Sequence, residues 1–486
     1  MKQLLIFLLC PFFIFSQEQI GQDINGETAG EQSGWSVSLS ADGNIVAIGA
    51  PTNSTNGSAS GQVRIFENQS GNWVQLGQDI NGEGTADQSG TSVSLSSDGS
   101  VIAVGAPRND GNGNDSGQVR VFENQSGNWV QIGLDIDGEM ANNRFGAAVS
   151  ISSDGNIVAI GAPFNSDGAG ASGHVRVFEN QSGDWIQIGQ DIDGESAGDF
   201  SGSAVSLSSD GNVVAIAAAR NDGNGNDSGH VRLFENQSGN WVQIGQDIDG
   251  ESPSDQSGSS VSVSSDGSRV AIGATFNNGN GGNSGQVRVF ENQAGSWIQI
   301  GLDLNGEDAG DLFGWSIDLS SDGNVLVGSG PANNSSRGYA KVYQEQSGSW
   351  VQVGQDIDGE AVNNFSGRSV SLSSDGRELA VGANRNSDNG NDSGHVRVYD
   401  LSSIILSLEA YLSNEFKLYP NPATDYFKIE IKEVGKLQKV NIYNGLGQYL
   451  FSTFETTINT TKLKSGLYFV ELEFTRGKTS KKLLVK

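Results

Sequence analysis

The chain has 486 residues, of which 57 are acidic and 28 basic, so its formal net charge at neutral pH is −29. This charge argues against nucleic acid as a partner, because phosphate binding requires clustered lysine and arginine. The 68 glycines and 8 prolines together stay below the ~25–30% that is typical of unstructured low-complexity sequence. The composition therefore indicates a folded, turn-rich chain.

Residues 1–16 contain one lysine followed by an apolar stretch from Leu4 to Phe15. That length fits a secretory signal peptide, whose apolar region spans ~7–15 residues, and is short for a membrane helix of ~20 residues. No other stretch is apolar enough to cross a membrane, so we expect a chain that is not membrane-spanning. Cys10 is the only cysteine. Its removal with the signal peptide would exclude disulfides, thiolate metal sites and a cysteine nucleophile.

Residues 17–400 consist of copies of one unit. The tryptophan that marks the unit recurs four times at a spacing of 56 residues (129 − 73 = 56) and once at 53 (350 − 297 = 53). These tryptophans are Trp73, Trp129, Trp185, Trp241, Trp297 and Trp350. A fixed period in this range is the signature of a repeat architecture.

The second copy shows what one unit contains. Four short runs have the length and β-branched content of strands: Ser92–Ser96, Val101–Ala106, Val119–Glu123 and Trp129–Ile132. Asp98-Gly99 is a two-residue hairpin signal between the first two runs, because glycine adopts a positive φ without strain. We place the turn between the last two runs at Ser126-Gly127, since that register groups the apolar residues on one face. The small residues of the first run suit a position near a crowded central axis.

Four antiparallel strands in about 55 residues are the content of a propeller blade, and propellers have ~4–8 blades. The chain contains seven first strands and seven third strands, but only six fourth strands that begin with tryptophan. Ile20–Ile24 repeats the sequence that follows this strand in other copies, so residues 18–24 can complete the seventh blade beside residues 394–399. We therefore predict an all-β fold with a seven-bladed β-propeller over residues 17–400. Closure by the N-terminal strand would remove the free sheet edge.

The unit resembles the FG-GAP repeat of integrin α-like propellers over residues 18–400. Phe145-Gly146 and Phe313-Gly314 match the first part of that motif, and Gly49–Pro51, Gly105–Pro107 and Gly161–Pro163 match the second. The resemblance implies the propeller fold and does not identify a partner. The calcium loop of that family is not carried over, because Ser-Asp-Gly between the first two strands cannot supply the 6–8 oxygens that calcium prefers.

The composition changes after residue 400. Residues 401–415 are predicted to be a linker, and residues 416–486 contain the strands and turns of a small C-terminal β-sandwich. This tail resembles the type A C-terminal sorting domain of the type IX secretion system of Bacteroidetes. The residues that carry the resemblance include Pro420, Asn421, Pro422, Gly447, Gly466, Lys481 and Lys482. The resemblance implies recognition by the type IX secretion machinery, removal of the tail, and a protein that is secreted or held at the outer cell surface.

Histidines, arginines and acidic residues recur at fixed positions of the unit. His174, His230 and His395 stand where other copies have glutamine, which favours a structural role. One strand position is basic in every copy, and we expect its side chain to pack on the aromatic face through cation–π contacts. The motif D-I-[DN]-G-E, as at Asp135–Glu139, could hold a hard cation such as calcium, but Asp-Gly is also ordinary turn chemistry. We favour solvated turns and expect no cofactor, with calcium as the alternative.

The sixth copy differs most from the others. Its loop between the second and third strands is shortened to Pro331–Gly338, and Tyr-Ala-Lys replaces the usual Gln/His-Val-Arg. Near-identical copies carry little information that is specific to one site, so a binding site is best sought where the copies differ. We hypothesise that Arg337, Tyr339 and Lys341 mark a binding surface, with sequence drift in one blade as the alternative.

No Ser/His/Asp set, phosphate loop, zinc motif or nucleophile elbow occurs in the sequence, so we expect no enzymatic activity. The expected function is a secreted or cell-surface module for binding or adhesion, whose partner is an extracellular protein or glycan. Two alternatives remain. One is an extracellular enzyme that acts on polysaccharide with carboxylates at the channel mouth, and the other is a passive calcium-binding surface protein.

Overall fold

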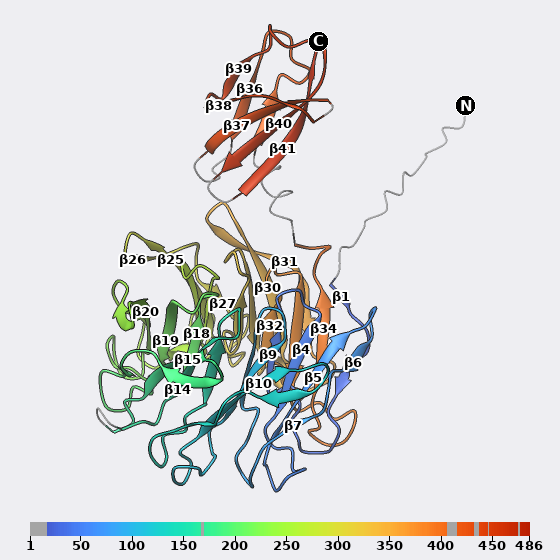
Figure 1. Cartoon of the computed structure of the whole chain (residues 1–486). Coiled ribbons are helices and arrows are strands. Elements are labelled where there is room, and N and C mark those ends of the chain that lie inside the picture. Colours follow the sequence, from blue (N-terminus) through green and yellow to red (C-terminus); the bar gives the residue numbers. More distant parts are fainter. Residues whose placement is uncertain (1–16, 167–169, 406–415, 432–436, 446, 475–476) are drawn as a thin grey trace, which may run out of the picture. The chain divides into compact units, whose positions relative to one another are not determined.

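The computed structural model describes residues 17–166, 170–405, 416–431, 437–445, 447–474 and 477–486 (Figure 1). The predicted signal peptide, residues 1–16, lies outside this described part, as do residues 406–415 of the predicted linker. The chain divides into two compact units, Met1–Ile404 and Ile405–Lys486. None of the helices in the described residues has the length and apolar character needed to cross a membrane.

The described residues of the first unit form seven antiparallel sheets with one shared strand order. The first strands of the sheets are β3 (Ser36–Leu39), β8 (Ser92–Leu95), β13 (Ala148–Ile151), β18 (Ala204–Leu207), β23 (Ser257–Val263), β28 (Ile317–Leu319) and β32 (Ser366–Leu372). The second strands are β4 (Ile45–Ala50), β9 (Val101–Ala106), β14 (Ile157–Ala162), β19 (Val213–Ala218), β24 (Arg269–Ala274), β29 (Val325–Gly330) and β33 (Glu378–Ala383). The third strands are β5 (Gln62–Asn68), β10 (Gln118–Asn124), β15 (His174–Gln181), β20 (His230–Gln237), β25 (Gln286–Gln293), β30 (Tyr339–Gln346) and β34 (His395–Asp400).

Each third strand also pairs on its far side. The partners are the fourth strands β6 (Trp73–Gln75), β11 (Trp129–Gln131), β16 (Asp184–Gln187), β21 (Asn240–Gln243), β26 (Ser296–Gln299), β31 (Ser349–Asp358) and β1 (Glu18–Gln19). In six of the sheets a two-residue strand follows and pairs with the same third strand: β7 (Ile80–Asn81), β12 (Ile136–Asp137), β17 (Ile192–Asp193), β22 (Ile248–Asp249), β27 (Leu304–Asn305) and β2 (Ile24–Asn25). A short helical turn, α1 (Asn333–Ser336), precedes β30.

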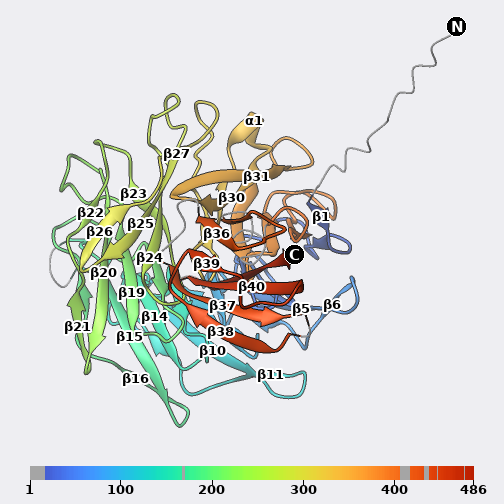
Figure 2. The same ribbon diagram turned by 90° about the horizontal axis from the view of Figure 1, so that it is seen from above.

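The N-terminal segment belongs to the same sheet as the last repeat. β1 pairs antiparallel with β34, with Glu18 opposite Asp400, and β2 continues the pairing with Ile24 opposite Val396. Seen from above, the sheets follow one another in chain order, and the first, in blue, lies beside the last, in orange (Figure 2). The N-terminal segment thus supplies the fourth strand that the seventh copy lacks in its own sequence.

The core of the first unit lies between neighbouring sheets. Val46 and Ile48 of β4 pack against Val396 and Val398 of β34 in one fully buried cluster. Burying a side chain of this size contributes roughly 1.5–3 kcal/mol, so each of these interfaces stabilises the packing of neighbouring sheets. The tryptophans add a polar contact between sheets, because Trp73 Nε1 donates to the carbonyl oxygen of Ile20 at 2.9 Å.

The structure confirms one predicted turn and corrects the other. Asn124 lies opposite Trp129, as a turn at Ser126-Gly127 requires, and both turn residues have positive φ, 57° and 88°. Asp98-Gly99 does not form a two-residue turn. The loop has four residues, because the Asp98 carboxylate accepts hydrogen bonds from Ser96 Oγ and the Ser100 amide and so stabilises a wider connection.

Serines of the first strands link neighbouring sheets. Ser38 Oγ accepts a hydrogen bond from the Leu95 amide at 3.0 Å, and Ser94 Oγ accepts one from the Ile151 amide at 3.1 Å. In the sixth sheet the equivalent residue is Asp318, which accepts from the Leu372 amide at 2.8 Å. Burial raises the pKa of Asp318 to about 6, although several hydrogen bonds to the carboxylate act in the opposite direction.

The second unit contains two antiparallel sheets. One has the strands β35 (Phe416–Tyr419), β36 (Tyr426–Ile431) and β39 (Thr457–Asn459), and the other has β38 (Tyr449–Thr453), β37 (Leu437–Asn444), β40 (Gly466–Phe474) and β41 (Gly477–Val485). Phe416 and Phe427 from the first sheet share one buried core with Val440, Val470 and Leu472 from the second.

Replacing Asp318 with serine, the residue of the other copies, is expected to stabilise the first unit in a pH-dependent way. Burial raises the pKa of the Asp318 carboxyl in the folded protein above its ordinary value. Asp318 is therefore best tolerated in the acid range, and the fold loses stability as the pH rises through about 6. Because each pKa unit corresponds to about 1.4 kcal/mol, the advantage of Asp318→Ser should grow by up to about 3 kcal/mol between pH 4 and pH 8. Urea unfolding at both pH values measures it, and an advantage independent of pH would contradict the assignment.

Candidate functional site

Two cavities lie among the first strands of the sheets. The larger has a volume of 590 Å³ and is lined by residues of all seven first strands or of the segments that lead into them. The smaller, of 190 Å³, lies toward the other ends of the same strands, beside Asp318. The larger cavity combines sufficient volume for a small ligand with side chains that differ from copy to copy.

The seven copies carry different residues at one repeat position that lines this cavity. It follows a glycine that has positive φ in every copy, for example Gly367 at 84°, where a Cβ atom would come within 2.6 Å of the carbonyl oxygen of Tyr339. The residues at this position are Trp35, Thr91, Ala147, Ser203, Ser259, Trp315 and Arg368. Three adjacent copies in the order of the sheets, the sixth, seventh and first, therefore supply the only large side chains of the set.

Arg368 lies between the two tryptophans. Its guanidinium carbon is 3.8 Å from the ring centroid of Trp35 and 4.9 Å from that of Trp315. Contacts of this kind orient a planar cation and leave its edge available for hydrogen bonding. Burial, and secondarily the positive charge of Arg385, lowers the pKa of Arg368 to about 10, so the side chain remains a cation at neutral pH.

Further arginines occupy positions that face this cavity in other copies. Phe276 lines the cavity, and Arg108, Arg220 and Arg385 hold the position of Phe276 in their own copies. All three are exposed. These three arginines therefore share the repeat position of a cavity residue, and the charge of Arg385 acts on Arg368.

Aromatic rings hold some of these cations in place. Arg144 lies 4.5 Å from the Phe164 ring, Phe164 lies 4.8 Å from Phe200, and Phe200 lies 4.8 Å from Arg220. Arg144 holds the repeat position of Gln256, another residue of the cavity wall. The third and fourth copies thus contribute a row of two cations and two rings at the same end.

These five arginines differ from most others in the unit. Ion pairs with Asp or Glu are made by Arg64, Arg120, Arg176, Arg232, Arg269, Arg288, Arg377 and Arg397. In the described residues, no such pair forms at Arg108, Arg144, Arg220, Arg368 or Arg385. In a chain with a net charge of −29, unneutralised cations at one end favour an anionic ligand.

The strand arginines behave as the sequence predicts. Arg64 lies 5.3 Å from the Phe66 ring, and Arg120 lies 5.2 Å from the Phe122 ring, with the same contact repeated in the third, fourth, fifth and seventh copies. These side chains are buried between sheets, so their role is structural.

The residues proposed as a surface in the sixth copy are mostly buried. Tyr339 is 1% exposed and stacks on Phe313, and Lys341 is 4% exposed and pairs with Glu307. Arg337 donates to the carbonyl oxygen of Gly359. Because these contacts lie within the unit, the structure offers little of Tyr339 or Lys341 to a partner.

The sorting motifs of the tail meet in the second unit. Asn421, which lies between Pro420 and Pro422, donates to the carbonyl oxygen of Lys482 at 2.8 Å and accepts from the Leu484 amide at 2.9 Å. Lys481 Nζ lies 4.7 Å from the centre of the Phe416 ring. Gly447 closes a turn with a φ of 77°, and Gly466 begins the long strand β40. The first motif therefore binds the last strand of the chain.

Two protein families match this chain. Residues 417–486 match the family described as "Secretion system C-terminal sorting domain". The chain is exported by type IX secretion. Residues 81–122 match the FG-GAP repeat, so the resemblances that the sequence motifs indicated are both confirmed. The protein's destination is the cell surface or the extracellular space.

Individual relatives are more distant. A curated protein of Formosa agariphila, named endo-acting ulvan lyase, is 36% identical over 92 residues, which are 18% of this chain and 18% of that protein. Among solved structures, a protein of Bacteroides uniformis described as a 6-phosphogluconolactonase is 15% identical, with a TM-score of 0.49. The match covers 67% of this chain and 85% of that protein's chain. A periplasmic gluconolactonase of Pseudomonas aeruginosa has 17% identity and a TM-score of 0.47, covering 79% and 97%.

These comparisons correct one expectation of the sequence analysis. The absence of a recognised catalytic motif predicted a chain without enzymatic activity, whereas the curated relative that is 36% identical over 92 residues is named a lyase. A motif search misses activity when catalytic groups come from separate blades, because each then contributes a single residue with no local signature. The expectation is withdrawn.

Removing residues 417–486 is expected to stop export while leaving the repeat unit folded, because the sorting domain is what directs type IX secretion. In the native host, the truncated protein should be retained in the cell and fall to the level of a lysis control in the medium and surface fractions. Fractionation with immunoblotting measures this, with the full chain as control. Undiminished appearance outside the cell would contradict the role of the tail.

Proposed function

We propose that residues 17–400 form a seven-bladed propeller, closed by the N-terminal strand, that binds an acidic glycan in its axial cavity outside the cell. Seven sheets of one strand order and the pairing of β1 with β34 support this architecture. Contacts between consecutive first strands, including β3 with β32, support a ring with the larger cavity on its axis.

The arrangement of Trp35, Arg368 and Trp315 is the single observation that carries the ligand class. An indole ring offers a flat apolar surface that suits the face of a sugar ring. A guanidinium group forms paired, charge-assisted hydrogen bonds with a carboxylate or a sulfate. Together they match a sugar that has an apolar face and an acidic substituent, and the surrounding unpaired arginines extend the match to a chain of such sugars.

Cleavage of the bound glycan is a second candidate function. The similarity to a protein named as an endo-acting ulvan lyase favours a polysaccharide lyase over other enzyme classes. A lyase product carries a new carbon–carbon double bond, which absorbs in the ultraviolet. Incubation of the purified chain with acidic polysaccharides, followed by absorbance, tests this function separately from binding.

Arg368→Ala is expected to weaken the binding of an acidic oligosaccharide by about 10- to 100-fold, because hydrogen bonds to charged groups contribute about 1.5–3 kcal/mol. Arg368→Lys should recover only part of the affinity, since lysine retains the charge without the planar fork. Calorimetric titration with uronic-acid and sulfated oligosaccharides, and with neutral ones of equal length, measures the effect.

Arg377→Ala is the matched control, because Arg377 already pairs with Asp375 and should not affect binding. Thermal melting verifies that each variant is folded. Equal affinities of Arg368→Ala and the wild type, or equal binding of neutral and acidic oligosaccharides, would refute the proposal.

A further inference from the structure

A buried histidine in the last sheet has an unused ring nitrogen. His395 is the first residue of β34 and pairs with Asn25 of β2. The side chain is 1% exposed, and its Nδ1 atom has no hydrogen-bond partner among the described residues. A buried polar atom without a partner costs about 1–3 kcal/mol, so its position needs a physical reason.

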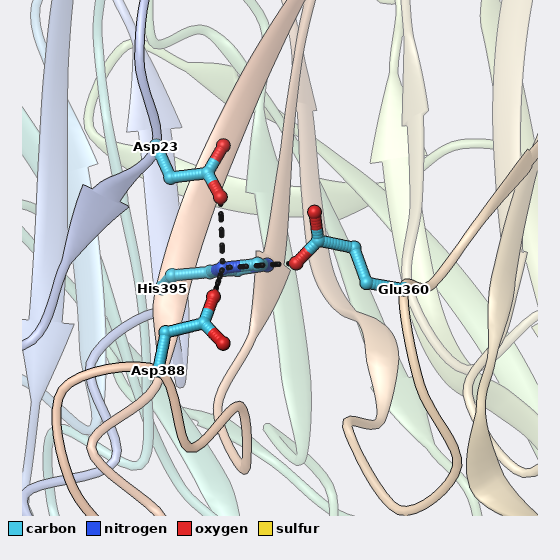
Figure 3. A group of neighbouring side chains, drawn as sticks. All are labelled: Asp23, Glu360, Asp388 and His395. Atoms are coloured by element: carbon cyan, nitrogen blue, oxygen red, sulfur yellow. Dashed lines mark ion pairs between the residues drawn. The ribbon is translucent and has the colours of Figure 1, made fainter.

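Three carboxylates surround this nitrogen. Nδ1 lies 3.6 Å from Asp23, 3.9 Å from Asp388 and 4.0 Å from Glu360. The four donor atoms all lie within 4.8 Å of one another. Figure 3 shows the three carboxylates converging on the imidazole from different sides. They come from the N-terminal segment, from the loop before β34 and from the end of the preceding sheet.

In two copies that have glutamine in place of this histidine, the glutamine side chain donates a hydrogen bond to one of the equivalent carboxylates. Gln62 Nε2 donates to Asp79, the repeat equivalent of Asp23, at 3.0 Å. Gln286 Nε2 donates to Glu251, the equivalent of Glu360, at 2.9 Å. At His395 the corresponding separations are 3.6 and 4.0 Å, too long for a hydrogen bond. Exchange of histidine for glutamine therefore changes the chemistry of the site.

The separations at His395 suit an ion between the donors. A tetrahedral zinc site with bonds of ~2.0–2.1 Å places neighbouring donor atoms ~3.3 Å apart. The four donor atoms lie within 4.8 Å of one another, so ligation would draw some pairs together by up to about 1.5 Å. Burial, followed by the positive charge of Arg397, lowers the pKa of His395 below its ordinary value. A neutral imidazole is the form that binds a metal.

We propose that Asp23, Glu360, Asp388 and His395 bind a divalent transition-metal ion of the zinc type. Imidazole nitrogen combined with carboxylate oxygens suits zinc and its neighbours, whereas calcium prefers six to eight oxygens. The negative charge of three carboxylates, compensated within the unit by Arg397 at 3.8 Å from Glu360, favours a dication at this place.

The fourth donor distinguishes this site from a related cluster. His230 lies near Glu195 and Asp247, at 3.9 and 4.0 Å, but the residue equivalent to Asp388 is Gly223. Fewer protein ligands bind a metal more weakly, so the cluster at His230 is a natural internal comparison for the complete set at His395.

The test is made in a His174→Gln background, because His174 forms a third cluster with Glu139 and Asp191. In that background the protein lacking residues 1–16, stripped with a chelator, should bind one tight equivalent of Zn²⁺ in calorimetric titration, and Zn²⁺ should raise its melting temperature. His395→Gln should weaken that site at least tenfold and abolish the thermal shift, and Asp388→Gly should weaken it as well. His230→Gln is the matched control and should retain the tight site.

Metal-free His395→Gln should melt at or above the temperature of the metal-free wild type, because glutamine stands at this position in other copies. If that variant does not fold, the exposed-loop variant Asp388→Gly decides the question instead. Three results would overturn the proposal: no zinc binding by the wild type, unchanged binding in both variants, or stabilisation by Ca²⁺ with none by Zn²⁺.

Discussion

No sheet in the repeat region can bury both of its faces alone. Each second strand is buried on both sides, as in β4, where Val46, Ala47 and Ile48 are all buried. The sheets must therefore pack on both neighbours, and the first and last sheets must find each other. The shared cluster of β4 and β34 meets this requirement. The fixed spacing of the first strands, the cavities between them and the position of the chain ends all follow from it.

The period, the strands and the register at Ser126-Gly127 were predictable, because each depends on contacts that are close in sequence. The loop at Asp98-Gly99 was not, since a side chain accepted hydrogen bonds that the turn rule ignores. The N-terminal strand was predictable from the number of strands. The sequence has seven third strands but only six fourth strands that begin with tryptophan, so one sheet required a fourth strand from elsewhere in the chain. Local patterns thus determined most of the fold, and errors arose where side chains competed with backbone preferences.

The cavity residues were harder to predict. Trp35 and Trp315 lie outside the strand that carries the repeat's own tryptophan, and nothing in one copy relates them to Arg368. Aligning the seven copies at the residue after the glycine would have shown them, because that position varies while its neighbours do not. The histidines differ from the glutamines in a way that the sequence does not show. Their exchange with glutamine predicts a structural role, and the distances around His395 show that the two side chains contact the same acids differently.

The register of Glu18 opposite Asp400 has a consequence for the timing of folding. The earliest described strand must wait for a partner that is made almost four hundred positions later, and joining such distant segments costs roughly 5 kcal/mol of chain entropy. A nascent or half-translocated polypeptide consequently cannot reach its final stability. The last sheet can close only after residues 395–400 have been made, so closure is a late step of folding.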